Sequence, residues 1–149
     1  MHQDIARSVA VASPRAEVWA ALLDFQRVAS WLSIVGEVRE LEPLRRYSAV
    51  LEDRVGPFAL RADLAATVRA EEPHLRVEAS GEDRQVASRI TATVDLAMAD
   101  EDGATRITVS GGYDITGKIA TLGAGAIRKK GEKVLDEFVA NLTRELGSR

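Results

Sequence analysis

Residues 58–70 read FALRADLAATVRA, and their apolar and polar side chains alternate almost without interruption. Phe58, Leu60 and Leu64 fall on one face at a spacing of two residues, whereas Arg61 and Asp63 fall on the other. Successive side chains of a β-strand point to opposite faces of its sheet. The stretch therefore predicts a strand of an antiparallel sheet that has one face on the core and one face in water.

The same alternation recurs elsewhere in the chain. It predicts further strands at about residues 3–12, 75–80, 89–98 and 107–115. Asp102-Gly103, between the last two strands, is a strong hairpin signal. Gly111-Gly112 indicates a bulge or a sharp bend, which a sheet needs if it is to curl.

Three segments carry helical patterns. Residues 13–24, SPRAEVWAALLD, predict a helix that Ser13 caps and Pro14 starts. A second short helix is expected at about residues 25–32, and the apolar stripe from Lys118 to Leu146 predicts one long amphipathic helix. The predicted fold is therefore α+β: a curved antiparallel sheet wraps around a long C-terminal helix, with two short helices after the first strand.

The composition narrows the class of protein. A length of 149 residues without a linker-like tract predicts a single domain over residues 1–149. The absence of cysteine excludes disulfides and thiolate metal sites, and a net charge of −3 gives no electrostatic footprint for nucleic acid. The sequence shows neither a signal-peptide pattern nor 18 consecutive apolar residues. We expect a cytoplasmic protein without a metal or a cofactor.

Small residues on the concave side of the sheet leave room for a ligand. The small inward positions of the predicted sheet are Ala49, Ala62, Ala66, Ala79, Ala92 and Gly111. One helix cannot by itself fill the inside of a curled sheet. Gly117, Gly123 and Gly125 each cost about 1 kcal/mol of helix propensity relative to alanine. Two explanations stay open: the glycines allow the helix to pack backbone to backbone on the sheet, or they make space for a ligand.

A pocket between sheet and helix would hold an apolar or amphipathic small molecule. We expect its lining to be Trp31, Leu51, Phe58, Leu60, Leu64, Ile90, Val94, Tyr113, Ile119, Leu122, Gly123 and Ile127. Trp31 is expected at the mouth of the cavity, and Trp19 in the core. The Tyr113 hydroxyl either orients a polar end of the ligand or bonds to a neighbouring backbone carbonyl, because a buried hydroxyl needs a partner.

Residues that could carry catalysis are scarce. His2 and His74 are expected at a fraying terminus and in a surface turn, so the predicted interior offers no general base. Asp53 and Asp114 are the candidate carboxylates, and both are expected at the rim. We therefore predict a carrier rather than an enzyme. The alternative is a cyclase- or hydrolase-like enzyme that uses Tyr113 with a rim carboxylate.

A basic cluster lies in the predicted long helix. It consists of Arg128, Lys129, Lys130 and Lys133. A solvated helix face is the favoured interpretation, and contact with anionic lipid or an acidic partner is the alternative. In the second case the chain would touch a membrane only peripherally, or act as an assembly factor through its surface.

Four features together resemble a known group. They are the order of the elements, SPRAEVWAALLD at residues 13–24, VGPF at residues 55–58, and GKIATLGAGAIRKKGEKVLDEFVANL at residues 117–142. They resemble the START/SRPBCC helix-grip superfamily and, within it, the carbon monoxide dehydrogenase G-subunit family. The likeness runs from about residue 3 to residue 146.

The resemblance implies a cavity between sheet and long helix that takes a hydrophobic, lipid- or quinone-like ligand. It also implies an accessory role around a molybdenum hydroxylase or CO dehydrogenase complex, in membrane recruitment and quinone handling. The chain departs from the family at Ile34-Val35-Gly36, where Ile-Pro-Gly is typical. It also ends at Arg149 without an apolar tail, so we expect no membrane attachment through such a tail.

Overall fold

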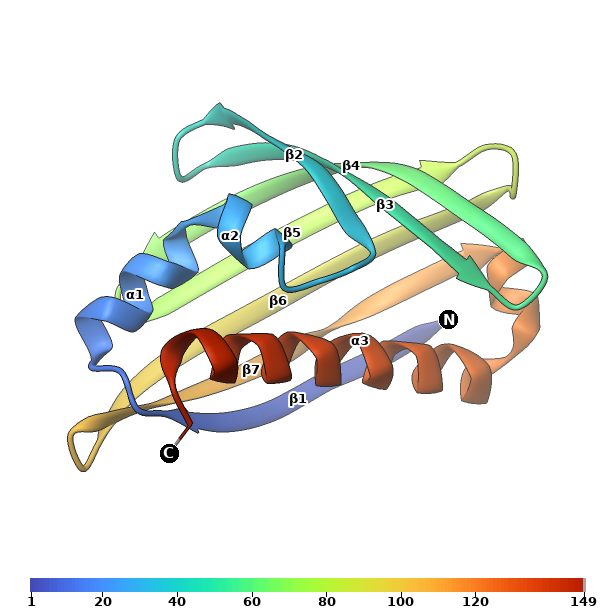
Figure 1. Ribbon diagram of the computed structural model, residues 1–149. Helices are drawn as coiled ribbons and strands as arrows, with labels where there is room; N and C mark the ends of the chain where they lie inside the picture. The colour runs from blue at the N-terminus through green and yellow to red at the C-terminus, as the bar shows by residue number, and fades with distance from the viewer. Residues whose placement is uncertain (149) are drawn as a thin grey trace.

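The sheet and its helices are those that the alternating pattern predicts. The computed structural model describes residues 1–148. Its elements are β1 (His2–Val11), α1 (Arg15–Leu23), α2 (Phe25–Ala29), β2 (Val35–Glu42), β3 (Arg46–Val55), β4 (Phe58–Glu71), β5 (His74–Asp83), β6 (Ser88–Glu101), β7 (Ala104–Gly117), the 3-10 helix η1 (Lys118–Leu122) and α3 (Ala124–Leu146). The predicted α+β helix-grip fold is confirmed (Figure 1).

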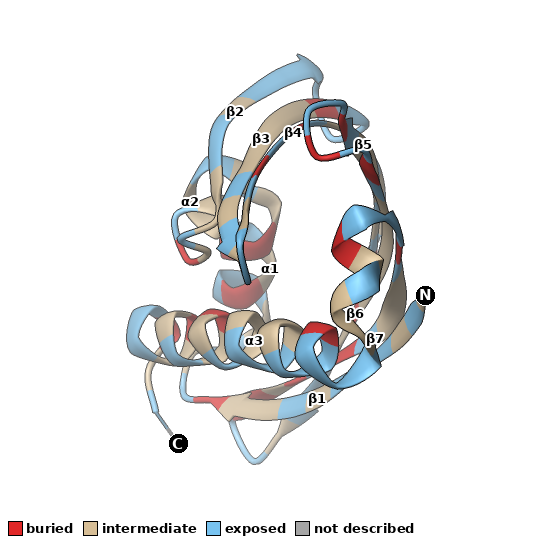
Figure 2. Cartoon of the chain, turned by 90° about the vertical axis from the view of Figure 1, so that its right-hand side faces the viewer, coloured by how far each residue is buried: buried red, intermediate tan, exposed pale blue. Residues whose placement is uncertain are grey.

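The seven strands form one antiparallel sheet in the order β1-β7-β6-β5-β4-β3-β2. The sheet curls strongly, and α3 runs along its concave side over β1, while α1 and α2 cover one end (Figures 1 and 2). The predicted hairpin joins β6 to β7, because Asp102 and Gly103 take φ values of 51° and 81°. Positive φ at both central residues is what a two-residue turn between twisted strands requires.

The glycine pair in β7 produces a bend rather than a bulge. The pairing of β7 with β6 and with β1 continues through Gly111 and Gly112 without a shift of register. Gly111 itself takes a φ of +130°, and a Cβ atom there would lie 2.0 Å from the carbonyl oxygen of Thr93. Only glycine tolerates this approach, so the residue allows the strand to curl.

The prediction of one continuous C-terminal helix is wrong at its start. Lys118–Leu122 is a 3-10 helix, and α3 begins only at Ala124. Gly117 and Gly123 flank the short helix, and both have a φ of +92°. A left-handed backbone cannot continue an α-helix, so the chain turns at each glycine. The apolar periodicity hid the break because Ile119 is buried like a helical core residue.

The short helices also begin and end differently from the prediction. Pro14 takes the N-cap position of α1, with φ −69° and ψ 158°, and no side chain caps this helix. Ser13 instead donates its hydroxyl to the carbonyl oxygen of Leu146, which ties the start of α1 to the end of α3. The second helix ends at Ala29, and the Asp24 carboxylate accepts the Arg27 N–H at its start.

The buried apolar residues form two separate clusters. The larger one joins α1, the C-terminal half of α3 and the adjacent sheet, with Val18, Leu22 and Leu142 among its buried residues. The smaller one, which we call the floor cluster, comprises Leu60, Val86, Ile115, Ile119 and Ile127. The clusters lie toward opposite ends of the strands, and the middle of the concave face lies between them.

Candidate functional site

The middle of the concave face carries a row of alanines. Ala66, Ala79 and Ala92 pair in register across β4, β5 and β6, and the row ends on Tyr47 at one side and Tyr113 at the other. Side chains directly opposite each other on neighbouring strands have Cβ atoms about 5 Å apart. The alanine row (Ala66, Ala79, Ala92) is therefore a continuous strip of methyl groups.

These alanines are only half-buried, although they point to the inside of the curled sheet. Leu64 and Val94, inward residues beside the row, are half-buried as well. In a close-packed interior such side chains are fully buried, as Leu60 and Ile107 are at the two ends of the sheet. The space over the alanine row, which we call the hollow, is therefore not filled by the protein's own side chains.

Most of the predicted lining lies around one end of the hollow. Leu60, Ile119 and Ile127 belong to the floor cluster, and Leu51, Phe58, Ile90 and Tyr113 pack against it. Leu122 lies over the β3–β4 turn, because a Cβ atom on Gly56 would be 3.1 Å from its Cδ2. Gly123 faces open space. Val94 and Trp31 belong to the other cluster, so the structure does not bring all predicted residues together.

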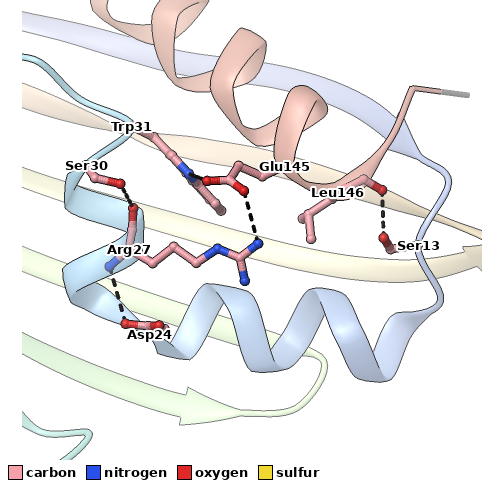
Figure 3. A network of polar contacts seen from close by, with 7 residues as sticks. All are labelled: Ser13, Asp24, Arg27, Ser30, Trp31, Glu145 and Leu146. Atoms are coloured by element: carbon pink, nitrogen blue, oxygen red, sulfur yellow. Dashed lines mark hydrogen bonds and ion pairs between the residues drawn. The ribbon is translucent and has the colours of Figure 1, made fainter.

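Trp31 is a core residue and does not form the mouth of a cavity. Its side chain is 1% exposed, and its ring packs against Phe138 with centroids 5.9 Å apart. The indole N–H donates to Glu145 at 3.3 Å, and this bond, followed by those from Arg27, lowers the pKa of the Glu145 carboxyl (Figure 3). Trp19, expected in the core, is half-buried. Helical spacing alone cannot separate the two tryptophans, because both follow apolar stripes.

One flank of α3 is tied to the loop after α2. Glu137 accepts hydrogen bonds from the backbone N–H and the hydroxyl of Ser33, and Asn141 donates to the carbonyl oxygen of Trp31 at 2.9 Å. Together with Glu145 these residues recur every four positions, which places them on the same side of the helix. The C-terminal half of α3 is thus held against α2.

A second tie joins α3 to β3. Lys130 Nζ lies 2.9 Å from Asp53 Oδ2, and the side chains are 31% and 17% exposed. Asp53 has the same inward parity as Leu51 and Val55, so its carboxylate faces the helix and not bulk water. Between Lys130 and Glu137 the helix advances about 10 Å. The hollow therefore has a polar bridge at each end of this stretch of α3.

Tyr113 is engaged by the helix. Its hydroxyl donates to the carbonyl oxygen of Ile127 at 3.2 Å, and burial, followed by the charge of Glu132, raises the pKa of the phenol. The residue that allows this contact is Gly131, where a Cβ atom would lie 2.1 Å from the Tyr113 oxygen. Sequence reasoning missed Gly131, although it stands on the buried stripe between Ile127 and Leu135 at intervals of four.

The glycines singled out from the sequence have other roles. A Cβ atom on Gly117 would lie 1.9 Å from the carbonyl oxygen of Ala87, which is a close approach of backbone to backbone. Gly123 and Gly125 have no neighbouring atom within 4 Å. The structure thus supports the packing explanation for Gly117 and leaves space beside the other two.

The charged candidates lie outside the hollow, apart from Asp53. Asp114 is paired with His2 at 3.2 Å on the outer face, and both Asp114 and Asp4 raise the pKa of that histidine. The prediction that His2 frays is wrong, because its backbone pairs with β7. His74 is exposed at the start of β5. Across residues 1–148, no three His, Asp or Glu side chains gather as metal ligands would.

The basic cluster divides into two parts. Arg128, Lys129 and Lys133 are exposed, as a solvated helix face predicts, whereas Lys130 is half-buried in its ion pair. In the part of the chain that the structure describes, no helix combines the length and the apolarity that a bilayer span needs.

Two depressions on the outer, convex face are polar. One, of about 350 Å³, is lined by residues such as Arg69, Arg76 and Asp95, and the other, of about 520 Å³, by residues such as Arg61 and Arg89. Ligand sites for apolar molecules are lined mostly by apolar side chains. Neither depression offers such a lining, so the hollow is the better candidate site.

Solved structures of several proteins share this fold. A conserved protein from Geobacillus kaustophilus is 17% identical, with a TM-score of 0.83 over 98% of this chain and 95% of that one. A START superfamily protein from Mycobacterium smegmatis is 11% identical, with a TM-score of 0.70 over 98% and 97%. The Zhui aromatase/cyclase from Streptomyces sp. R1128 is 12% identical, with a TM-score of 0.72 over 98% and 94%. At these identities the likeness shows the fold alone.

The family assignment comes from the sequence itself. No curated protein matches the chain. The model of the carbon monoxide dehydrogenase G-subunit family (CoxG) matches residues 8–147, nearly the whole length. With the START-like fold, this match establishes that the chain belongs to the CoxG family of carbon monoxide dehydrogenase.

Proposed function

We propose that the protein binds an apolar, lipid- or quinone-like small molecule in the hollow and carries it in the cytoplasm without chemical conversion. The observation that supports this function is the half-buried alanine row between two buried clusters. A protein without a ligand there would gain stability from larger side chains at these positions, because close packing is favourable. Three small residues in register are instead what a ligand cavity requires.

The proposed contacts are the half-buried apolar residues around the row. They are Leu51, Phe58, Leu64, Ile90, Val94, Tyr113 and Leu122. Removing apolar surface from water contributes about 25 cal/mol per Å², so 300 Å² of buried ligand surface would supply roughly 7 kcal/mol before the costs of association. Affinity in the micromolar range is therefore within reach without any charged contact.

The carrier role is favoured over catalysis by the state of the polar groups. The Tyr113 hydroxyl, the candidate acid or base of the alternative, is bonded to a helix carbonyl and has a raised pKa. A general base works best with a pKa near the operating pH. The raised pKa moves this phenol away from that range.

The test compares two alanines that are adjacent in β4. Ala66→Leu fills the hollow, whereas Ala65→Leu adds the same side chain to the exposed outer face. We expect the first change to weaken binding of the fluorescent apolar dye Nile red at least tenfold and to leave the melting temperature nearly unchanged. The second should leave dye binding intact.

A densely packed interior would give a different result. Overpacking a filled core costs about 1–3 kcal/mol, so a large loss of stability in Ala66→Leu would show that no hollow exists. Equal dye binding in both variants would also contradict the proposal. Native mass spectrometry of freshly purified protein would identify a retained ligand.

Family membership supports a further part of this proposal: an accessory role for a molybdenum hydroxylase or CO dehydrogenase complex. The exposed cations Arg128, Lys129 and Lys133 are the proposed contact with an acidic surface of that partner or of a membrane. Changing all three to glutamate should abolish co-purification with the enzyme and preserve dye binding. Unchanged co-purification would exclude this surface.

A further inference from the structure

We propose that the Lys130–Asp53 pair anchors the polar end of the ligand, and that this end is an uncharged hydrogen-bond acceptor such as a carbonyl oxygen. The inference rests on the proposed function, since it names the chemistry of the molecule in the hollow. The observation behind it is an ion pair on the inner side of the sheet where apolar residues surround it.

The position of the pair is that of an anchor at the rim. Asp53 lies between Leu51 and Val55, and both of these residues pack against the floor cluster. Lys130 reaches it from α3, one residue before Gly131, which contacts Tyr113. The two charges thus lie beside the apolar floor and close to the surface, where an amphipathic ligand would place its polar end.

Lys130 has hydrogen-bonding capacity left. An ammonium group has three N–H donors, and the pair with Asp53 Oδ2 uses one of them. The other oxygen of Asp53 accepts the backbone N–H of Arg54 at 2.8 Å, so the carboxylate is held in place. The second polar group beside the floor, the Tyr113 hydroxyl, already donates its proton to Ile127. Lys130 is therefore the donor best placed to meet an acceptor of the ligand.

The charge balance of the pair selects the kind of acceptor. A carboxylate bound to Lys130 would also lie near Asp53, and the repulsion would offset most of the attraction, because both act over similar distances. The desolvation of the ligand's charge would then be uncompensated. A carbonyl oxygen loses little hydration and still gains a charge-assisted hydrogen bond. The pair thus favours ketones, esters or quinone-like rings over fatty acids.

The experiment displaces Nile red from the full-length protein with two ligands of similar length, 2-tridecanone and dodecanoate. Lys130→Met should weaken displacement by the ketone about tenfold, a factor that corresponds to about 1.4 kcal/mol. Asp53→Asn should strengthen displacement by dodecanoate about tenfold, because Lys130 then carries an unpaired charge. Lys129→Met, which removes an exposed charge one residue away, should change neither value and is the matched control.

The outcomes separate this inference from the proposed function. If Nile red binds to the wild type but neither variant changes the ligand preference, the anchor is wrong and the carrier function stands. If Nile red does not bind at all, both are wrong. Circular dichroism of each variant checks its fold, and the two substitutions are independent, so misfolding of one leaves the other decisive.

Discussion

Gly131→Ala is the substitution whose effect the structure predicts most sharply. In a solvent-exposed helix, alanine in place of glycine stabilises by about 1 kcal/mol. At Gly131 the new Cβ atom would lie 2.1 Å from the Tyr113 oxygen, so the ring or the helix must move. Overpacking costs about 1–3 kcal/mol, and loss of the hydrogen bond to Ile127 costs about 0.5–1.5 kcal/mol. The net expectation is a loss of about 2 kcal/mol and a fall in Tm of about 4–8 °C.

Urea and thermal unfolding measure this effect, and two variants control for it. Gly125→Ala in the same helix meets no atom within 4 Å and should stabilise the protein by up to about 1 kcal/mol. Tyr113→Phe removes the oxygen and leaves Cζ, 2.9 Å away, as the closest atom, so the double variant should recover about 1 kcal/mol of the loss. If Gly131→Ala stabilised the protein as much as Gly125→Ala, the contact between α3 and Tyr113 would be refuted.

Two further predictions concern stability. Asp83 accepts backbone N–H groups of Arg61, Val86 and Gln85, with Arg61 the largest contributor, and these bonds lower the pKa of its carboxyl. A depressed pKa gives stability that is present above the unfolded value of about 3.9 and is lost as the pH falls through the folded value. The deficit of Asp83→Asn should therefore be full at pH 7 and shrink below about pH 4; a deficit independent of pH would contradict it. Trp31→Ala should cost about 3–5 kcal/mol in urea unfolding, because it empties a core position, and the equivalent change at the half-buried Trp19 should cost clearly less. Equal losses would disagree with the burial of the two rings.

The elements and the concave face of this protein could be predicted from local pattern. Alternation in residues 58–70 places Leu60, Leu64 and Ala66 on the inner face, as the structure does, because the pleat of a strand is a local property. The Asp102-Gly103 turn and the small residues that form the alanine row follow from residue types alone. The expected lining of the pocket was correspondingly better on the strands than on the helices.

The contacts across the hollow depended on how the elements pack. Periodicity reports which side of an element is apolar, but not which residue stands opposite. For that reason Trp31 was placed at a mouth, and Gly131 was overlooked where it meets Tyr113. The break at Gly123 was hidden too, because a 3-10 turn keeps Ile119 on the buried side.

The pairing of Lys130 with Asp53 shows the same division. Local residue pattern was enough to define the sheet, its curl and its small inner face, since each depends on neighbours along the chain. The path of α3 across that face, in contrast, brings a cation of the basic cluster to an inward carboxylate on β3. Such a contact depends on the angle and the offset between two elements, which the packing of the whole molecule sets.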